Sequence, residues 1–159
     1  MRMAMVFAAC LLAAPALAQE RQSLVSTQVR VIGEVQHELT LTVDDLRAIA
    51  MRRALISGGG YTGLRLIDVL EEADIRRDAR LALRRTYIVA SATDGFQVVF
   101  SWAELFNTSV GGGVLVAFER DGAPLRDGEG RIALVSLADD RPGTRHVKWL
   151  SRIEVRRAD

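Results

Sequence analysis

Short runs of alternating apolar and polar residues dominate this chain. Residues 27–33 alternate, with Val29 and Val31 on one face, and residues 38–41 continue the strand into a hairpin. Further strands are expected over residues 54–56, 87–92, 97–100, 114–118, 132–135 and 147–155. The spacing of parallel β-α-β units is absent from the pattern, so the strands do not predict a doubly wound fold.

Short helices are expected between these strands. Thr42 is typical of an N-cap, because Asp44 and Asp45 follow it in the first turn, where the helix dipole favours acids. Residues 61–63 are expected to introduce a second helix, whose buried stripe includes Leu66, Ile67, Val69 and Leu70. A third short helix is expected over residues 102–106. The fold class is therefore a mixed α+β structure with a strand-rich core.

Four glycine-containing segments are interpreted as turns. Residues 93–95 (Thr-Asp-Gly) and 120–122 (Arg-Asp-Gly) are hairpin signals. The triple glycines at residues 58–60 and 111–113 lack the Gly-Lys-Ser/Thr ending of a nucleotide-binding loop and do not match Gly-x-Gly-x-x-Gly. No serine lies in a Gly-x-Ser-x-Gly elbow, so a serine hydrolase is weakly supported.

Residues 1–18 have the pattern of a secretory signal peptide. Arg2 precedes an apolar stretch, and Ala16-Leu17-Ala18 supplies a small-x-small cleavage site. The stretch is too short for a stable membrane span. We therefore expect cleavage after Ala18, no transmembrane segment, and a periplasmic protein in which residues 19–159 form a single domain.

Cys10 is the only cysteine of the chain, and it lies within this leader. A lipoprotein signal ending at Cys10 is the alternative interpretation of the leader, although Phe7 stands where leucine is usual. The mature protein is thus expected to have no disulfide and no thiolate ligand. His37 and His146 are far apart in sequence, which argues against a dedicated transition-metal site.

The charge balance argues against nucleic acid as a partner. Removal of the leader takes away Arg2 and no acid, which leaves 20 basic against 20 acidic side chains. A nucleic-acid binder would need a broad positive surface instead. The five arginines between Arg76 and Arg85 form only a local cluster, interpreted as a solvated helix end and loop or as a docking patch for an acidic partner or anionic lipid.

The segment of residues 143–155 concentrates donors. The only lysine of the chain, Lys148, lies beside Arg145 and His146 and next to Trp149. An arginine fork, an ammonium group and an imidazole suit an anionic or heteroatom-rich ligand. The alternative interpretation is a closing β-strand with solvated charges, because the apolar positions alternate as in a half-buried strand.

The order of these elements resembles the molybdopterin-binding domain of the sulfite oxidase family. The resemblance extends over nearly all of the mature chain, and it rests on residues 31–35, 39–46, 61–70, 94–100, 114–125 and 145–150. The most specific of these are the Asp-Gly-x-Pro-Leu turn at residues 121–125 and the Arg-x-Val-Lys-Trp-Leu motif at residues 145–150. The resemblance implies a strand-rich sulfite oxidase-type fold with short helices.

The resemblance also implies a ligand site. In the family the Arg and Lys of the last motif help to hold the pterin cofactor, which assigns ligand contacts to Arg145 and Lys148, with His146 nearby. The remaining pocket residues are expected to be Ser57, Tyr61 and Trp102. Tyr61 could equally be a core or edge aromatic, and Trp102 could be plain packing.

The chain departs from the family at the metal. The enzymes ligate molybdenum through a cysteine before the second helix, and here residues 53–61 contain Ser57 but no cysteine. An alkoxide is far less accessible than a thiolate, so Ser57 does not replace it. We therefore expect a pterin or molybdopterin-like ligand without a protein-ligated metal, and a function that is more binding than catalytic.

Short secreted bacterial proteins of this fold are thought to bind pterins and to report on them to a membrane signalling partner, and this chain resembles them. Two alternatives remain. One is an oxidoreductase, or a subunit of one, that holds a molybdenum cofactor through the pterin alone. The other is a ligand-free interaction scaffold that meets a partner through the arginines of residues 76–85 or the loop of residues 111–113.

Overall fold

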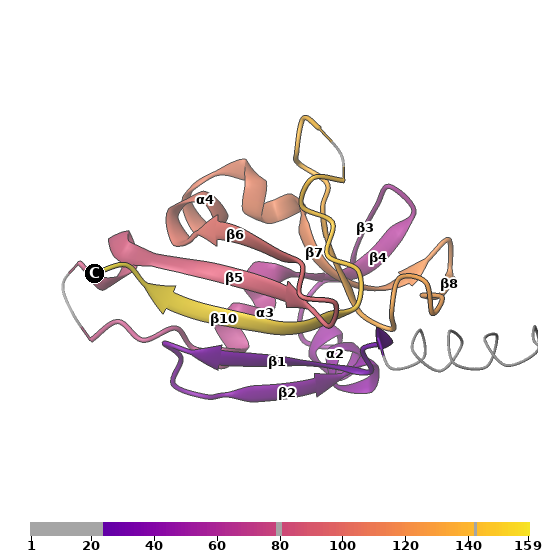
Figure 1. The fold of residues 1–159 in the computed structure, drawn as a ribbon, viewed down its shortest axis with the longest axis horizontal. Coiled ribbons are helices and arrows are strands. Elements are labelled where there is room, and N and C mark those ends of the chain that lie inside the picture. Colours follow the sequence, from indigo (N-terminus) through magenta and orange to yellow (C-terminus); the bar gives the residue numbers. More distant parts are fainter. Residues whose placement is uncertain (1–23, 79–80, 142) are drawn as a thin grey trace, which may run out of the picture.

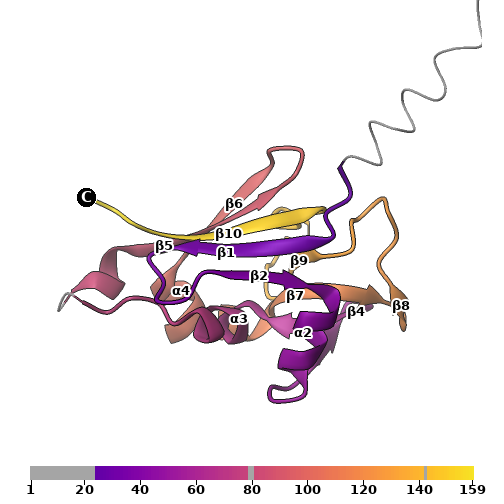
Figure 2. The same ribbon diagram turned by 90° about the horizontal axis from the view of Figure 1, so that it is seen from below.

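Two five-stranded sheets form the framework of the part of the chain that the structure describes (Figures 1 and 2). The computed structural model describes residues 24–78, 81–141 and 143–159. The expected signal peptide and Cys10 lie outside these residues. The strand-rich α+β class predicted from the sequence is confirmed.

The first sheet brings together the two ends of the described chain. Its strands run in the order β2 (Leu39–Thr42), β1 (Gln28–Gly33), β10 (Leu150–Arg157), β5 (Thr86–Ala92) and β6 (Gln97–Ser101). β1 and β10 pair in parallel, and the other neighbours are antiparallel. The last strand therefore occupies the middle of the sheet, as Figure 1 shows.

The second sheet is built around one long central strand. It contains β3 (Ile56–Gly58), β4 (Tyr61–Arg65), β7 (Val114–Arg120) and β8 (Ala123–Pro124), and β9 (Ala133–Ser136) also pairs with β7. The β3–β4 turn uses Gly59 and Gly60, both with positive φ. Asp121 and Gly122 likewise have positive φ in the β7–β8 turn, so the turns predicted at these two glycine segments are confirmed.

Three short helices connect the strands. These are α2 (Val43–Ala50), α3 (Leu66–Ala73) and α4 (Trp102–Asn107), and the 3₁₀ turns are η1 (Ala82–Arg85) and η2 (Ser109–Gly113). Thr42 caps α2 as predicted, because its hydroxyl accepts from the Asp45 N–H while the Asp45 carboxylate accepts from the Thr42 N–H. No helix in the described part of the chain is long and apolar enough to cross a membrane.

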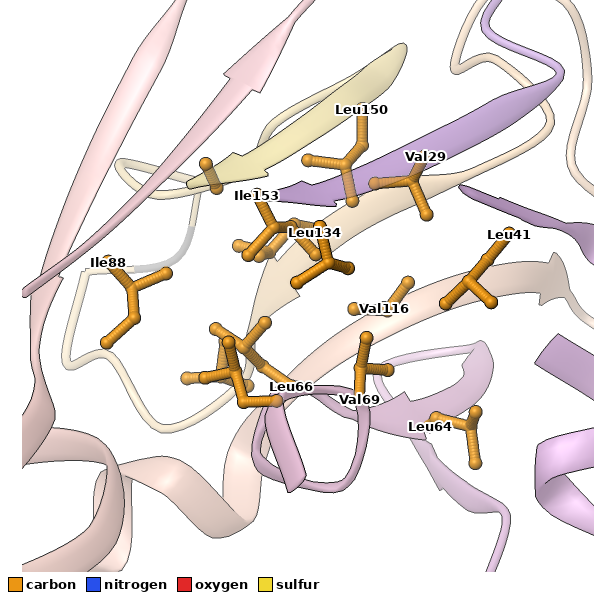
Figure 3. Close-up of a cluster of buried hydrophobic side chains, with 14 of the residues drawn as sticks. Val29, Leu41, Leu64, Leu66, Val69, Ile88, Val116, Leu134, Leu150 and Ile153 are labelled. Carbon is orange, nitrogen blue, oxygen red and sulfur yellow. The ribbon is translucent and has the colours of Figure 1, made fainter. Parts of the chain in front are cut away.

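The core lies between the two sheets and includes one face of α3 (Figure 3). Val29 and Ile153 reach into it from the first sheet, Val116 and Leu134 from the second, and Val69 from the helix. All five are fully buried. Burial of branched aliphatic side chains from both layers is the main force holding the sheets together.

Three predicted elements are wrong in their bounds. The strand expected over residues 54–56 is β3 in the structure, which begins at Ile56 and ends at Gly58. Residues 61–65 form strand β4 before the second helix begins at Leu66, because Tyr61 to Arg65 pair with β7 on one side and β3 on the other. The closing strand begins at Leu150, not at Val147. Val147 makes only an isolated bridge to Leu134, and Trp149 has a φ of 50°, which interrupts any extended run.

Candidate functional site

The segment before β10 is held by its backbone at two points. Val147 exchanges two hydrogen bonds with Leu134, of 2.8 and 2.9 Å, and its side chain is fully buried. The Trp149 N–H donates to the Glu129 carbonyl over 2.7 Å, and its indole Nε1–H donates to the Asp127 carbonyl over 2.7 Å. These contacts hold Trp149 in a left-handed backbone conformation, which the sequence alone does not predict.

His146 and Lys148 line the same recess because Val147 between them points into the core. The recess has a volume of about 240 Å³. Its other lining residues are Asp94, Phe96, Gly143 and Trp149. The β5–β6 turn and the segment before β10 thus form its two sides.

The β5–β6 turn contributes a carboxylate and an aromatic ring. Asp94 Oδ1 accepts from the Phe96 N–H over 2.9 Å, which orders the turn and leaves Oδ2 for other donors. The Phe96 side chain is 45% exposed. Sequence reasoning predicted the turn but missed both residues as site residues; the signal was an Asp-Gly turn that ends in an exposed aromatic.

Behind the recess, His146 meets Tyr61 and Glu129. The rings of His146 and Tyr61 meet edge to face, with centroids 5.5 Å apart and planes at 80°. His146 Nε2 lies 3.9 Å from Glu129 Oε2, and both atoms are buried without a hydrogen-bond partner among the residues that the structure describes. Burial holds the pKa of His146 below its usual value, although the Glu129 charge opposes the shift. The imidazole is therefore neutral at pH 7.

Arg120 extends this cluster to a second cavity. Its guanidinium lies 4.9 Å from the centre of the Tyr61 ring and donates to Glu129 over 2.5 Å. Arg120 and Glu129 line a pocket of about 470 Å³ next to the β7–β8 turn, together with Asp121 and Arg126. Burial raises the pKa of the Tyr61 phenol, so it stays protonated.

Arg145 is committed to other groups. Its Nε donates to Asp139 over 2.9 Å, its Nη2 donates to the same carboxylate, and its Nη1 donates to Glu104 over 2.7 Å. The guanidinium also lies 4.3 Å from the centre of the Phe100 ring. Asp139 above all raises the pKa of Arg145. Arg145 is not among the described residues that line the recess, and it ties the segment before β10 to α4.

Ser57 and Trp102 lie apart from the recess. Ser57 is opposite Thr62 in the β3–β4 hairpin, and their hydroxyls are 2.8 Å apart, so Ser57 is on the other hairpin face from Tyr61. Trp102 stacks on Phe106 with ring centroids 5.1 Å apart and packs against the core. Of the six residues predicted, the structure brings together Tyr61, His146 and Lys148.

Residues 48–159 match the family model described as oxidoreductase molybdopterin binding domain. The chain belongs to this family. Its fold is similar to that of the sulfane dehydrogenase SoxCD from Paracoccus pantotrophus, with a TM-score of 0.57, 20% sequence identity, and coverage of 80% of this chain. The match spans 37% of the length of that protein. No curated protein matches the sequence significantly.

The residues that line the recess fit the organic part of the family's cofactor. The recess offers a carboxylate, an ammonium group, a neutral imidazole and two aromatic side chains, which suit a pterin ring. Within the described ranges, no group of three or more His, Cys, Asp or Glu residues is placed to hold a metal ion.

Proposed function

We propose that this protein binds a pterin in the periplasm without catalysing a reaction, and reports on that ligand to a membrane-bound signalling partner. The observation that carries the binding step is the recess between the β5–β6 turn and the segment before β10. There Asp94, His146 and Lys148 gather beside Phe96 and Trp149.

Each group in the recess has a counterpart on a pterin. The 2-amino group and N3–H of the ring form a donor edge that suits the free Oδ2 of Asp94. The 4-oxo group is an acceptor that suits the Lys148 ammonium. The exposed Phe96 ring offers an apolar face against which a flat heterocycle can stack.

The protonation state of His146 favours a neutral ligand edge. Because Nε2 is buried beside Glu129, only Nδ1 of the neutral imidazole is left to meet a ligand, as a donor or as an acceptor. Ring nitrogens and the oxo group of a pterin match this mixed character. Lys148 then supplies the positive charge that an anionic substituent would require.

The non-catalytic part of the proposal rests on the sequence. No cysteine follows Cys10, so the mature domain cannot offer a thiolate to molybdenum. The periplasmic location rests on the signal-peptide pattern of residues 1–18. The signalling role rests on the resemblance to short secreted pterin-binding proteins of this fold.

The decisive experiment is to express the chain with its leader, purify the protein from the periplasm, denature it, and assay released pterins by fluorescence and molybdenum in the same sample. Pterin release with little molybdenum is expected. Stoichiometric molybdenum would favour the oxidoreductase. No pterin, even after reduced pterins are added back, would favour the ligand-free scaffold.

Variants test the assignment of the recess. Asp94→Asn and Lys148→Gln should each weaken the affinity for a reduced pterin about tenfold, the usual effect of losing one charge-assisted hydrogen bond. Arg84→Gln removes an exposed charge from η1 and serves as the control. Unchanged affinity in Lys148→Ala would count heavily against a pterin site in this segment.

A further inference from the structure

A row of polar side chains crosses the outer face of the first sheet. In the strand register Arg30 of β1 lies beside Arg152 of β10, Arg152 lies opposite Ser91 of β5, and Ser91 lies opposite Gln97 of β6. The neighbours of Arg30 in β1, Val29 and Val31, are fully buried, so Arg30 points away from the core. Figure 2 shows α2, α3 and α4 on the other side of this sheet.

The two arginines of this row have little negative charge to balance them. Glu154 Oε2 lies 3.9 Å from Arg152 Nε, but it accepts a hydrogen bond from Arg156 Nη2 over 2.7 Å. Arg152 Nε is buried and has no hydrogen-bond partner in the described part of the chain. Within residues 24–78, 81–141 and 143–159, Arg30 makes no ion pair within 4.0 Å. Like charges on neighbouring strands repel, which makes this arrangement unfavourable without a counter-charge.

A groove of about 520 Å³ lies over this row. Arg30 and Arg152 line it together with the hydroxyl-bearing residues Ser26, Thr27, Ser91, Thr93 and Ser151. Ser151 sits at the register shift between Leu150 and Arg152, and its hydroxyl donates to the Ser91 carbonyl over 3.2 Å. The register shift thus lies directly beside Arg152.

We propose that this groove is an oxyanion site that takes a phosphoryl group. Two guanidinium forks side by side match the several oxygens of a phosphate, and each N–H···O bond is charge-assisted. A bound phosphoryl group would neutralise the repulsion between Arg30 and Arg152, which lie beside each other in the strand register. This groove and the recess lined by His146 and Lys148 have no lining residue in common. A failure of phosphate binding here would therefore leave the pterin proposal untouched, and the reverse also holds.

The phosphoryl group can come from a soluble phosphate monoester or from a lipid headgroup, and two probes distinguish these sources. Inorganic phosphate and glycerol phosphate are titrated into the full protein by NMR, and co-sedimentation is measured with phosphatidylglycerol vesicles and with phosphatidylcholine vesicles. Soluble binding supports a free phosphate ligand. Binding to the phosphatidylglycerol vesicles alone supports a headgroup. Binding to neither probe overturns the proposal.

Variants tie the binding to the groove. Arg30→Gln and Arg152→Gln should each weaken binding of the responding probe about tenfold or more. Arg152→Lys keeps the charge but loses the fork, and should weaken it as well. Arg84→Gln, which removes one exposed arginine elsewhere, should not. Equal losses in Arg30→Gln and Arg84→Gln would overturn the assignment, because they would indicate net charge alone.

Thermal unfolding gives a readout that separates binding from folding. The probe should raise the melting temperature of the wild-type protein, because a ligand that binds only the folded state stabilises it. Without the probe, Arg30→Gln should melt no lower than wild type, since it removes one of two like charges. The probe should then fail to raise its melting temperature. Pterin affinity of these variants should match wild type.

Discussion

Arg145 and Asp139 form a two-point ion pair, in which Nε donates to Oδ2 over 2.9 Å and Nη2 donates to Oδ1. The Asp139 side chain is only 9% exposed, and Ser136 donates a further hydrogen bond to it. The pair connects the residues just after β9 with the segment before β10. Glu104 on α4 accepts a hydrogen bond from Nη1 of the same guanidinium.

Replacing Arg145 by Gln should therefore destabilise the fold. The change leaves Asp139 and Glu104 partly buried without a counter-charge, which costs about 1–3 kcal/mol. Urea unfolding of Arg145→Gln, Asp139→Asn and the double variant measures this loss. We expect the two losses to be less than additive, and strict additivity would contradict a direct pair.

The stability of the protein should depend on pH through His146. In the unfolded chain a histidine titrates near pH 6.5, and burial holds the folded pKa lower, so the unfolded state binds more protons between the two values. Stability is then fully present above about pH 6.5 and declines as the pH falls toward the folded pKa.

His146→Gln should flatten this decline, as measured by urea unfolding between about pH 7.5 and pH 5.5. His37→Gln is the matched control, since that side chain is exposed. A decline of the same slope in wild type and His146→Gln would show that other groups cause it.

Two neighbouring glycines of η2 should respond oppositely to alanine. A Cβ on Gly111 would lie 1.8 Å from the Leu105 carbonyl oxygen, whereas a Cβ on Gly112 would have no atom within 4 Å. Gly111→Ala should cost about 3 kcal/mol or more, because backbone must move to admit the methyl group. Gly112→Ala should change the free energy of unfolding by less than about 1 kcal/mol. Chemical denaturation compares the two directly, and similar losses would contradict this packing of η2 on α4.

The hairpin of β3 and β4 should affect ligand binding from one face only. Tyr61 touches His146, whereas Ser57 is on the other face and bonds Thr62. Tyr61→Leu should therefore weaken pterin binding in a fluorescence titration, and Ser57→Ala should leave it unchanged. An equal loss in both variants would place the ligand elsewhere on the hairpin.

Local signals explain which elements could be predicted. The cap at Thr42 and the turns at Asp94-Gly95 and Asp121-Gly122 depend on neighbouring residues alone, and the sequence predicted them. Strand β4 was missed because Gly63 and Arg65 interrupt its apolar pattern; its Gly63 is required by β7, whose Val116 carbonyl oxygen would lie 2.1 Å from a Cβ. That requirement is visible only once the strands are paired.

The candidate site was predicted in part for the same reason. Lys148 and His146 could be singled out because they stand together in the chain. The pairing of Arg145 with Glu104 could not, since Glu104 is 41 positions away and meets Arg145 only through the packing of α4. The left-handed conformation of Trp149 likewise follows from its contacts to Asp127 and Glu129 and has no local signal.

The parallel pairing of β1 with β10 sets the order in which the domain can fold. The first sheet consists of two local hairpins, β1–β2 and β5–β6, and only β10 joins them. Before β10 is available, the two hairpins therefore stay separate. Each then has an unpaired strand edge, and the core between the sheets is incomplete. The first sheet is therefore incomplete until β10 is in place, so a chain that crosses a membrane unfolded would complete this sheet only after β10 had followed.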